Sequence, residues 1–550
     1  CSYGYCIKQK EDELRATCCT ISSIAKAGWG LDDTGTPHAY FAETPAALKV
    51  ALNEILAKTV GKEASETAPV FASGTTSVSG ASDTIASNRF FASFQPTPGD
   101  ITLGKLSRER YLCEGASLKP KLALIEPAKD DYAARLNSHK DERTIMTAVG
   151  LTNSSQSVRP MYDALVQDDG IGLQSIDTLQ AGNLVSSPSS SFPGAVPAKG
   201  MYPDSTCDTT GAYCCFPTTT GSRPTRSSCS SRFLTMELGT SKPTNIEFER
   251  ASAFGAIMHS TPVVMTAPNA GLADTSYGEF SRVLRTRPPT LFSATTDGQL
   301  HAFDITNNTD NTLNEMWSFI PPAVLPLVPS QFPNKYKASP QNLLDGPVVV
   351  QDVVGSVSNT GRFFLTRTRA QAANPALTRW YTILVGSLGA SGGYYAMDVT
   401  WPDSTKPVPT GSGYHAGPRF LWQLTTDGSG NPLFGDRAIG TPAITTLYFT
   451  APGDTVPGEH AVAILPGGAG GVVSSTQFDT DPNCGSTNDD YNESIAGFGG
   501  SVKFRCNWRQ YTPKDSNDVS VRALGGARSI TVVMLATGEV IRTFRRSDVK

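Results

Sequence analysis

The sequence predicts a mainly β protein whose C-terminal part, residues 251–550, is a β-propeller with at least three blades. Three observations predict this class. A pattern of four short strands occurs three times after residue 254, the 50 Gly and 38 Pro exceed their usual combined share, and the cysteines cluster in stretches of small residues. By the same criteria, residues 67–250 form a β-rich connector with disulfide-stapled loops, and residues 1–66 are a short α/β remnant.

Length and charge exclude several classes of protein. The 550 residues are too many for one ordinary domain. A net charge of −4 with 17% charged residues gives no field that would hold nucleic acid or an anionic membrane. No apolar run approaches the roughly 18 residues that a membrane-spanning helix requires. The chain begins at Cys1 without a Met or an apolar leader, and we expect it to be a fragment of a longer protein.

The segments before the repeats differ in composition. The best helix signal lies at 44–56, where an N-cap Thr, a Pro at the first helical position and apolar residues at helical spacing follow one another. Residues 61–90 are small and polar, which indicates a linker or an extended arm. Apolar residues among polar ones over 89–111 predict short antiparallel strands, and the Ser/Thr/Gly/Pro-rich stretch 150–245 predicts elaborated loops.

The cysteines are clustered. Four lie in the first nineteen residues, four in 207–229, and Cys484 and Cys506 form a third group. Local cross-links in such small-residue surroundings predict disulfides in an exported protein. Zinc is the rival explanation, but there are only six His, none near a cysteine cluster, and no CxxC at zinc-ribbon spacing. The eleven cysteines are Cys1, Cys6, Cys18, Cys19, Cys113, Cys207, Cys214, Cys215, Cys229, Cys484 and Cys506.

The repeated pattern is the most informative part of the chain. Each copy starts with a small residue, a Pro and β-branched residues, and the prolines Pro262, Pro347 and Pro442 stand 85 and 95 residues apart. A Pro at the start of a strand fits an inner or edge position, where the missing N–H is tolerated. The expected strands of the three copies are 260–264, 290–294, 301–306 and 316–319; 345–349, 382–386, 395–400 and 421–424; and 440–444, 461–465, 533–538 and 541–544.

Four short strands per repeat are typical of a propeller blade, because each four-stranded sheet buries its faces by stacking on the next. The spacing exceeds the roughly 40–50 residues of a bare blade, so each repeat carries loop insertions. Three blades cannot close a ring of four to eight, and we expect the remaining blades to lie mainly in chain that is missing from this sequence.

Several motifs in a fixed order resemble the PilC/PilY family of type IV pilus tip adhesins. They are His-Ser-Thr-Pro-Val-Val at 259–264, Asp-Gly-Gln-Leu-His-Ala-Phe-Asp at 297–304, Trp-Ser-Phe-Ile-Pro-Pro at 317–322, and the runs 380–389 and 392–400. The resemblance covers roughly 250–470 and 529–545. Upstream it extends more loosely, to the tail of a von Willebrand A-like domain over 1–66 and a β-rich connector.

The resemblance implies a large, non-enzymatic, exported protein that passes through the periplasm and stands extracellularly at the pilus tip. Such a protein docks on minor pilins in the tip complex, supports pilus biogenesis and twitching motility, and adheres to a host or abiotic surface. The family's metal motifs are not carried over. The DxSxS motif of the von Willebrand A-like domain and the DxDxDG calcium loop of the propeller are both absent from this sequence.

One loop is a candidate calcium site. Asp479, Asp481 and Asn483 occupy positions 1, 3 and 5 of an EF-hand-like loop, and Asp490 falls at position 12. Oxygen ligands at that spacing suit Ca²⁺, although position 6 is a Cys instead of Gly and an Asp at position 12 reaches less far than a Glu. The alternative is a solvated acidic insertion pinned by a Cys484–Cys506 disulfide.

Several other motifs and residues that could have a catalytic or binding role are better interpreted as structural. Residues 389–393 match GxSxG, but the strand that follows predicts a Gly-rich hairpin instead of a nucleophile elbow. Trp317 and Trp422 are expected to pack between blades, since they occupy repeated positions, although a sugar-binding surface would also use Trp. Four histidines with no carboxylate or second histidine at a fixed spacing are expected to be structural or exposed: His259, His301, His415 and His460.

Two other functions remain alternatives. Quinoprotein oxidoreductases have propellers with similar Asp-x-x-Thr-Gly and Trp motifs and a vicinal disulfide over the quinone, which draws attention to the adjacent pairs Cys18-Cys19 and Cys214-Cys215. Both pairs precede the repeats and lie among other cysteines, so we expect separate partners for each thiol. A carbohydrate-binding propeller is the second alternative.

Overall fold

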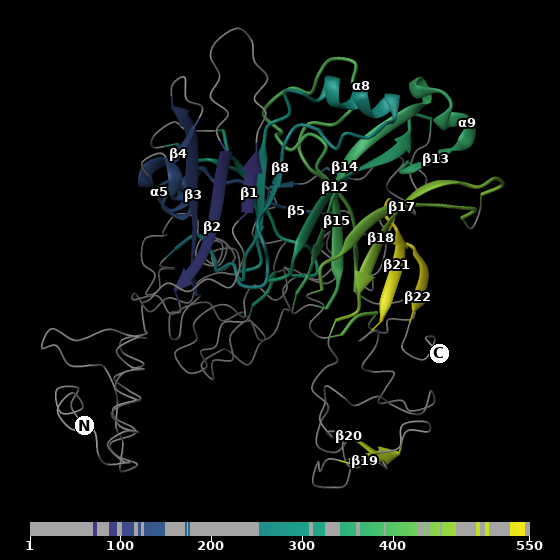
Figure 1. Cartoon of the computed structure of the whole chain (residues 1–550). Coiled ribbons are helices and arrows are strands. Elements are labelled where there is room, and N and C mark those ends of the chain that lie inside the picture. The colour runs from purple at the N-terminus through teal and green to yellow at the C-terminus, as the bar shows by residue number, and fades with distance from the viewer. Residues whose placement is uncertain are drawn as a thin grey trace, which may run out of the picture. The chain divides into compact units, whose positions relative to one another are not determined.

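The computed structural model describes residues 70–73, 87–95, 102–114, 119–122, 126–148, 171–172, 174–175, 252–306, 312–324, 342–358, 364–389, 392–425, 433–435, 440–451, 454–468, 491–494, 501–504 and 529–544 (Figure 1). All of these belong to one of two compact units, Glu63–Lys550; the other is Cys1–Lys62. The helix expected over 44–56 and every cysteine except Cys113 lie outside the described residues, so the disulfide prediction stays untested. The predicted three-part division of the chain likewise stays a prediction.

The sheet that precedes the repeats, called the β1–β4 sheet below, has four antiparallel strands that pair in chain order. It consists of β1 (Val70–Ser73), β2 (Ser87–Gln95), β3 (Leu103–Glu114) and β4 (Lys119–Leu122). Phe90, Phe94 and Leu106 are buried on one face, as the period of two in a strand requires. The strands expected from the 89–111 pattern are therefore confirmed, and they are longer than the pattern indicated.

Short helices and strands connect this sheet to the repeats. They are α4 (Pro127–Asp130), α5 (Tyr132–Ser138), the 3₁₀ turn η2 (Lys140–Glu142), β5 (Ile145–Thr147), β6 (Ile171–Gly172) and β7 (Gln174–Ser175). Asp131 caps α5 by accepting a hydrogen bond from the Ala134 N–H. Tyr132, Ala133 and Leu136 bury the inner side of α5 in a cluster with β2, β3 and the first repeat.

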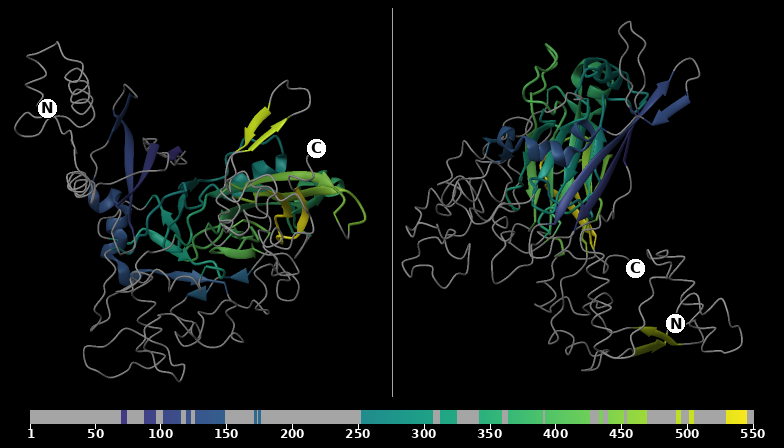
Figure 2. Two further views of the ribbon diagram at one scale, coloured as in Figure 1. Left: turned by 90° about the horizontal axis from the view of Figure 1, so that it is seen from below. Right: turned by 90° about the vertical axis from the view of Figure 1, so that its left-hand side faces the viewer.

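Each of the three repeats forms a four-stranded antiparallel unit in chain order, as predicted. The sheet of the first repeat, called the first sheet from here on, contains β8 (Val263–Met265), β9 (Thr290–Ala294), β10 (Leu300–Asp304) and β11 (Glu315–Phe319). The second contains β12 (Val348–Ser356), β14 (Thr378–Ser387), β15 (Tyr394–Asp398) and β16 (Arg419–Leu424). The third contains β17 (Ala443–Phe449), β18 (Gly458–Pro466), β21 (Ile530–Met534) and β22 (Val540–Phe544). Seen from below in Figure 2, the colour runs from teal through green to yellow across these sheets, in chain order.

Insertions between the strands carry the remaining elements. Helix α8 (Thr275–Val283) lies between the first two strands of the first repeat, and β13 (Thr366–Thr368), α9 (Arg369–Ala372) and the 3₁₀ turn η6 (Pro375–Leu377) occupy the same place in the second. Strand β13 pairs with β18 and so joins the third sheet. The β19 (Tyr491–Ser494) and β20 (Ser501–Phe504) hairpin lies between the second and third strands of the third repeat.

The register shows which residues of the three repeats are equivalent. A bulge interrupts the pairing of the third and fourth strands at the same point in each, directly after Ala302, Ala396 and Val532. The fourth-strand partners of these residues are Trp317, Trp422 and Arg542. Arg542 therefore occupies in the third sheet the position that a Trp occupies in the other two.

The prolines that precede the first strand of each repeat stand at equivalent positions in two of the three repeats. Strands β8, β12 and β17 each pair with only the second strand of their repeat among the described strands, so of the two expected positions, inner or edge, these Pro-started strands occupy the edge of the described sheets. The pairs Val263 with Phe292, Val349 with Val385 and Ala443 with Ile464 are equivalent. Pro262 and Pro442 directly precede this position, whereas Pro347 stands one residue further back.

The cores lie between neighbouring sheets. One cluster joins the first sheet to the second through Phe292, Phe319, Tyr395 and Phe420, and a second cluster joins the second sheet to the third. The described residues are thus mainly β, as predicted. Three stacked sheets do not close a ring, and the propeller stays a prediction at this point.

Candidate interaction surface

The buried tryptophans join one sheet to the next. Trp317 and Trp422 are both fully buried, so the expectation that they pack between sheets is confirmed and neither can stack on a sugar at the surface. The Trp317 indole N–H donates to the carbonyl oxygen of Pro402 over 2.8 Å, and that of Trp422 donates to Leu535 over 2.8 Å. Both acceptors follow the third strand of the next repeat. Equivalent Trp donors therefore make a similar contact twice, one repeat apart, although the acceptors stand at different positions after the third strand.

A fully buried charged cluster surrounds Glu315 on β11. Its carboxylate accepts hydrogen bonds from Arg143 Nε at 2.8 Å and Nη2 at 3.1 Å, and lies 2.6 Å from His301 Nδ1. The side chains of all three residues are fully buried. Burial opposes the charge, but Arg143 and His301 outweigh it and lower the pKa of Glu315 to about 2. A substrate cannot reach this cluster, and its evident role is to join the segment before β5 to the first sheet.

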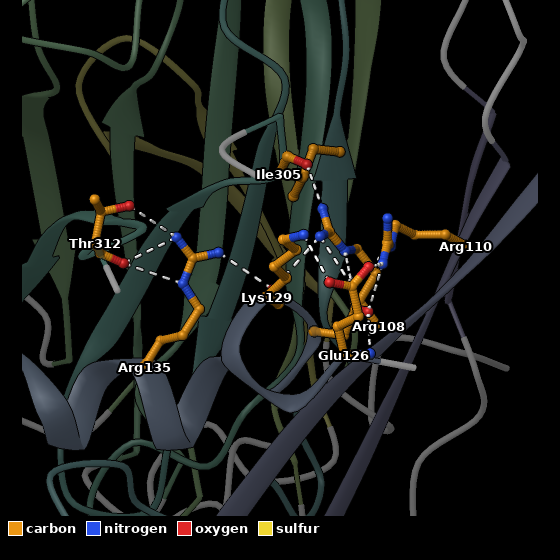
Figure 3. Close-up of polar contacts among 8 residues, drawn as sticks. Arg108, Arg110, Glu126, Lys129, Arg135, Ile305 and Thr312 are labelled. Atoms are coloured by element: carbon orange, nitrogen blue, oxygen red, sulfur yellow. Dashed lines mark hydrogen bonds and ion pairs between the residues drawn. The ribbon is translucent and has the colours of Figure 1, made fainter. Parts of the chain in front are cut away.

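A second polar network fastens the β1–β4 sheet and α5 to the first sheet (Figure 3). The Asp130 carboxylate accepts from Arg108 Nε and Arg110 Nε, each at 3.0 Å. Arg108 Nη1 also donates to the Ile305 carbonyl oxygen at 2.8 Å, and Arg135 donates to that of Thr312 at 2.9 Å. Burial opposes the Asp130 charge, but these arginines and the Glu126 N–H hold the pKa of Asp130 below its ordinary value. The connector next to the first sheet is thus anchored by charge-assisted bonds.

Three histidines have carboxylate partners that the sequence spacing did not indicate. His301 Nδ1 lies against Glu315, His259 Nδ1 lies 2.6 Å from Asp345, and His460 Nε2 lies 3.2 Å from Asp454. Burial lowers the pKa of His460. The partners are contributed by other strands and loops, so only the folded chain brings them together. His415 is exposed, and the structural or surface role expected for all four agrees with these surroundings.

The GxSxG match forms a hairpin, as expected. Strand β14 ends at Ser387 and β15 begins at Tyr394, and the Gly392 N–H donates to the Gly389 carbonyl oxygen at 3.0 Å between them. Gly389 has a φ of 59°, which an L side chain rarely adopts. A nucleophile elbow requires a helix after the turn, and here a strand follows.

Insertions from all three repeats meet at one surface. Arg367 on β13 donates to Asp274, the N-cap of α8, at 2.7 Å and to Glu459 on β18 at 2.7 Å. One guanidinium on the insertion of the second repeat thereby joins the insertion of the first repeat to the second strand of the third repeat. Beneath them, the Trp380 indole donates to Ser276 Oγ at 2.8 Å and the Tyr277 hydroxyl donates to Asp352 at 2.7 Å.

The insertion surface is defined as the described residues 266–289, 357–358, 364–377, 447–451 and 454–459. It carries most of the exposed large apolar side chains among the described residues. Tyr448 is the most exposed of them, at 58%. Exposed apolar side chains that gather on one surface mark contact sites for proteins, whereas singly scattered ones do not. The six members are Leu272, Val357, Leu377, Leu447, Tyr448 and Val456.

The calcium candidates Asp479, Asp481, Asn483 and Asp490 lie outside the described residues, and the site stays a prediction. Within the described ranges, no group of three or more His, Cys, Asp or Glu side chains is placed to hold a metal ion. Nor does any helix in those ranges have the length and apolar character needed to cross a bilayer.

Fold and surface together define a mainly β protein of stacked four-stranded sheets whose charged clusters are buried and whose insertions expose an apolar surface. The chain is 28% identical over 245 residues to the type IV pilus biogenesis factor PilY1 homolog of Xylella fastidiosa, covering 41% of the chain and 17% of the relative. It is 30% identical over 167 and over 182 residues to the PilY1 proteins of two Pseudomonas aeruginosa strains, covering 29% and 30% of the chain and 12% and 13% of those relatives.

The resemblance predicted from the motifs is confirmed over the aligned part of the chain, which is similar in sequence to proteins named as PilY1 pilus biogenesis factors. The aligned segments span less than a fifth of each of these relatives. No family model matches the chain, and no solved structure matches it.

Proposed function

We propose that the chain is part of a non-enzymatic, exported type IV pilus tip adhesin and assembly factor, and that its three sheets are consecutive blades of a β-propeller. The observation that carries the propeller is the recurrent indole-to-carbonyl bond from Trp317 and Trp422 to the following sheet. A contact that recurs with the repeat is expected of sheets arranged around a common axis, since each meets the next in the same way.

The function follows from the PilY1 relatives and from the chemistry of the insertion surface. Minor pilins and the pilus tip complex are the proposed partners, and contact with a host or abiotic surface, twitching motility and an extracellular position at the tip belong to the same proposal. The exposed Leu447 and Tyr448 supply apolar area at the centre of such a contact, and aromatic side chains are enriched among residues that dominate binding.

The experiment replaces Tyr448 by Asp, which puts a charge into the proposed contact. Thr441→Asp is the matched control, because Thr441 is also exposed but precedes the opposite end of β17. We expect Tyr448→Asp to weaken co-purification of the minor pilins at least tenfold and to reduce twitching, while the control retains both. Equal co-purification by both variants would contradict docking through this surface.

A quinoprotein oxidoreductase remains the alternative, because its blades resemble these in sequence. The charged cluster around Glu315 argues against it in one respect, since its side chains are closed to substrate. Reduction of a redox dye by the purified chain after addition of pyrroloquinoline quinone would favour the alternative. A carbohydrate-binding propeller is the second alternative, and glycan-array binding that survives Tyr448→Asp would favour it.

A further inference from the structure

The outer edge of the first sheet is covered by a short strand from the connector. Strand β5 runs parallel to β11, with Ser318 opposite Ile145 and Phe319 opposite Met146. The Ser318 N–H donates to the Thr144 carbonyl oxygen at 2.9 Å, and the Ile320 N–H donates to that of Met146 at 2.9 Å. The outward backbone groups of this fourth strand are thus satisfied by three residues of added strand.

The outer edge of the second sheet is covered in a similar way. Strand β6 runs antiparallel to β16, with Phe420 opposite Ile171, and β7 just after it pairs with β5. Strand β6 thus pairs with the fourth strand of the second sheet, and β7 pairs with the strand that covers the first sheet. Both edges show what these fourth strands accept: a short extended segment, held mainly by backbone hydrogen bonds.

The third sheet differs from these two. Among the described strands, none lies beyond β22. The register makes Thr543 the equivalent of Ser318, so its N–H points away from the sheet. Val540 and Phe544 are each 39% exposed, and the Arg542 guanidinium lies 4.9 Å from the centre of the Phe544 ring. β22 therefore presents apolar, cationic and aromatic side chains in alternation along a strand edge.

We propose that the β22 edge binds an extended segment of a partner protein, which adds to the third sheet as β5 adds to the first. Backbone hydrogen bonds to Ile541 and Thr543 would supply affinity, and the side chains of Val540, Arg542 and Phe544 would select the sequence. The partner segment has apolar side chains with a carboxylate opposite Arg542. This site goes beyond the proposed function, because it is separate from the insertion surface and binds an extended strand.

Charge favours a different protein over a second copy of this chain. Two copies of β22 that paired symmetrically about Arg542 would bring two guanidinium groups directly opposite each other, and like charges in that position destabilise a strand pair. A partner segment with a carboxylate opposite Arg542 is instead stabilised by the charge of the guanidinium. An exposed edge with a charged residue is also a usual protection against self-association.

The test measures amide hydrogen exchange in residues 540–544 of the full chain, alone and with a synthetic peptide of alternating Val and Glu at up to millimolar concentration. We expect the peptide to slow exchange in β22 at least tenfold and to leave β9 unchanged. A peptide of the same sequence with N-methylated backbone should have no effect, since it cannot donate the required hydrogen bonds. Equal protection by both peptides would overturn the proposal.

Two variants test the backbone hydrogen bonds of the β22 edge and the contribution of its side chains separately. Thr543→Pro removes the outward N–H and should abolish protection, and Arg542→Glu keeps the backbone and should shift preference to a Val/Lys peptide. Unchanged preference in Arg542→Glu would refute the side-chain assignment even if Thr543→Pro fails to fold. The proposal also falls if β22 amides in the chain alone are as protected as those of β21, or if sedimentation shows a dimer that Arg542→Glu strengthens.

Discussion

Replacing Glu315 by Gln tests the buried cluster that joins the connector to the first sheet. The substitution keeps the size of the side chain but removes the carboxylate charge that pairs with the fully buried Arg143 guanidinium. Breaking a buried ion pair on one side costs about 3–5 kcal/mol. Since a domain is stable by only about 5–15 kcal/mol, the variant should lose a large part of its stability.

The assay is urea unfolding at pH 7, followed by the fluorescence of the buried Trp317 and Trp422. The double variant Glu315→Gln, Arg143→Met should recover part of the loss, because it removes both charges and leaves no buried ion. Glu279→Gln is the control: its carboxylate is 58% exposed and pairs with Arg282 at the surface, and no measurable change is expected. A loss below about 1 kcal/mol in Glu315→Gln, or a double variant as unstable as the sum of both singles, would refute the reasoning.

The same carboxylate predicts a pH dependence. The pKa of Glu315 is about 2 in the folded chain and 4.5 ordinarily, so the unfolded chain binds the proton more readily. The stabilisation is therefore fully present above about pH 4.5 and is lost as the pH falls toward 2. Its size is on the order of 3 kcal/mol. Unfolding free energies of the wild type and Glu315→Gln should converge over this range, and parallel curves would contradict the assignment.

Three further variants test the sheets and the connector. Trp422→Phe should cost about 1–3 kcal/mol in urea unfolding, because the Leu535 carbonyl oxygen loses its donor; an unchanged midpoint would contradict the bond between sheets. Gly346→Ala should lower the melting temperature, since a Cβ there would overlap the Ser387 side chain, and a stable variant would show that β12 and β14 of the second repeat have room to move apart. Asp130→Asn should speed amide exchange in α5 while the third sheet stays protected, and uniform exchange would show that the network does not anchor the connector locally.

The strands of the repeats could be predicted because each combines apolar β-branched residues with turn residues at its ends. The residues that are equivalent between repeats could not be predicted exactly, because matching sequence motifs and pairing by backbone hydrogen bonds align the repeats differently. Matching Asp-x-Thr places Leu535 beside Asp304 and Asp398, whereas the bulge after the third residue of each third strand makes Met534 their equivalent. The turn after the third strand differs by one residue between the repeats, and a motif that is aligned on the Thr does not reveal this difference.

The connector's contacts could not be predicted for a different reason. Arg143 and Glu315 are 172 residues apart, and nothing in either local sequence indicates the other. Strands β6 and β7 have two residues each, too few for any alternation to appear. Such strands form because an existing edge supplies their partners, so they are consequences of the assembled sheets.

Arg542 links these observations to the order of the sheets. At the two equivalent positions an indole buries its ring and needs one acceptor, which the next sheet supplies as a backbone carbonyl oxygen. A guanidinium has five donors and keeps its charge, so it cannot be buried in the same surroundings without further acceptors. Whatever contacts the third sheet at this point must therefore offer a carboxylate or several carbonyl oxygens. The contact made by the third sheet at this position is therefore chemically distinct from those made by the first two.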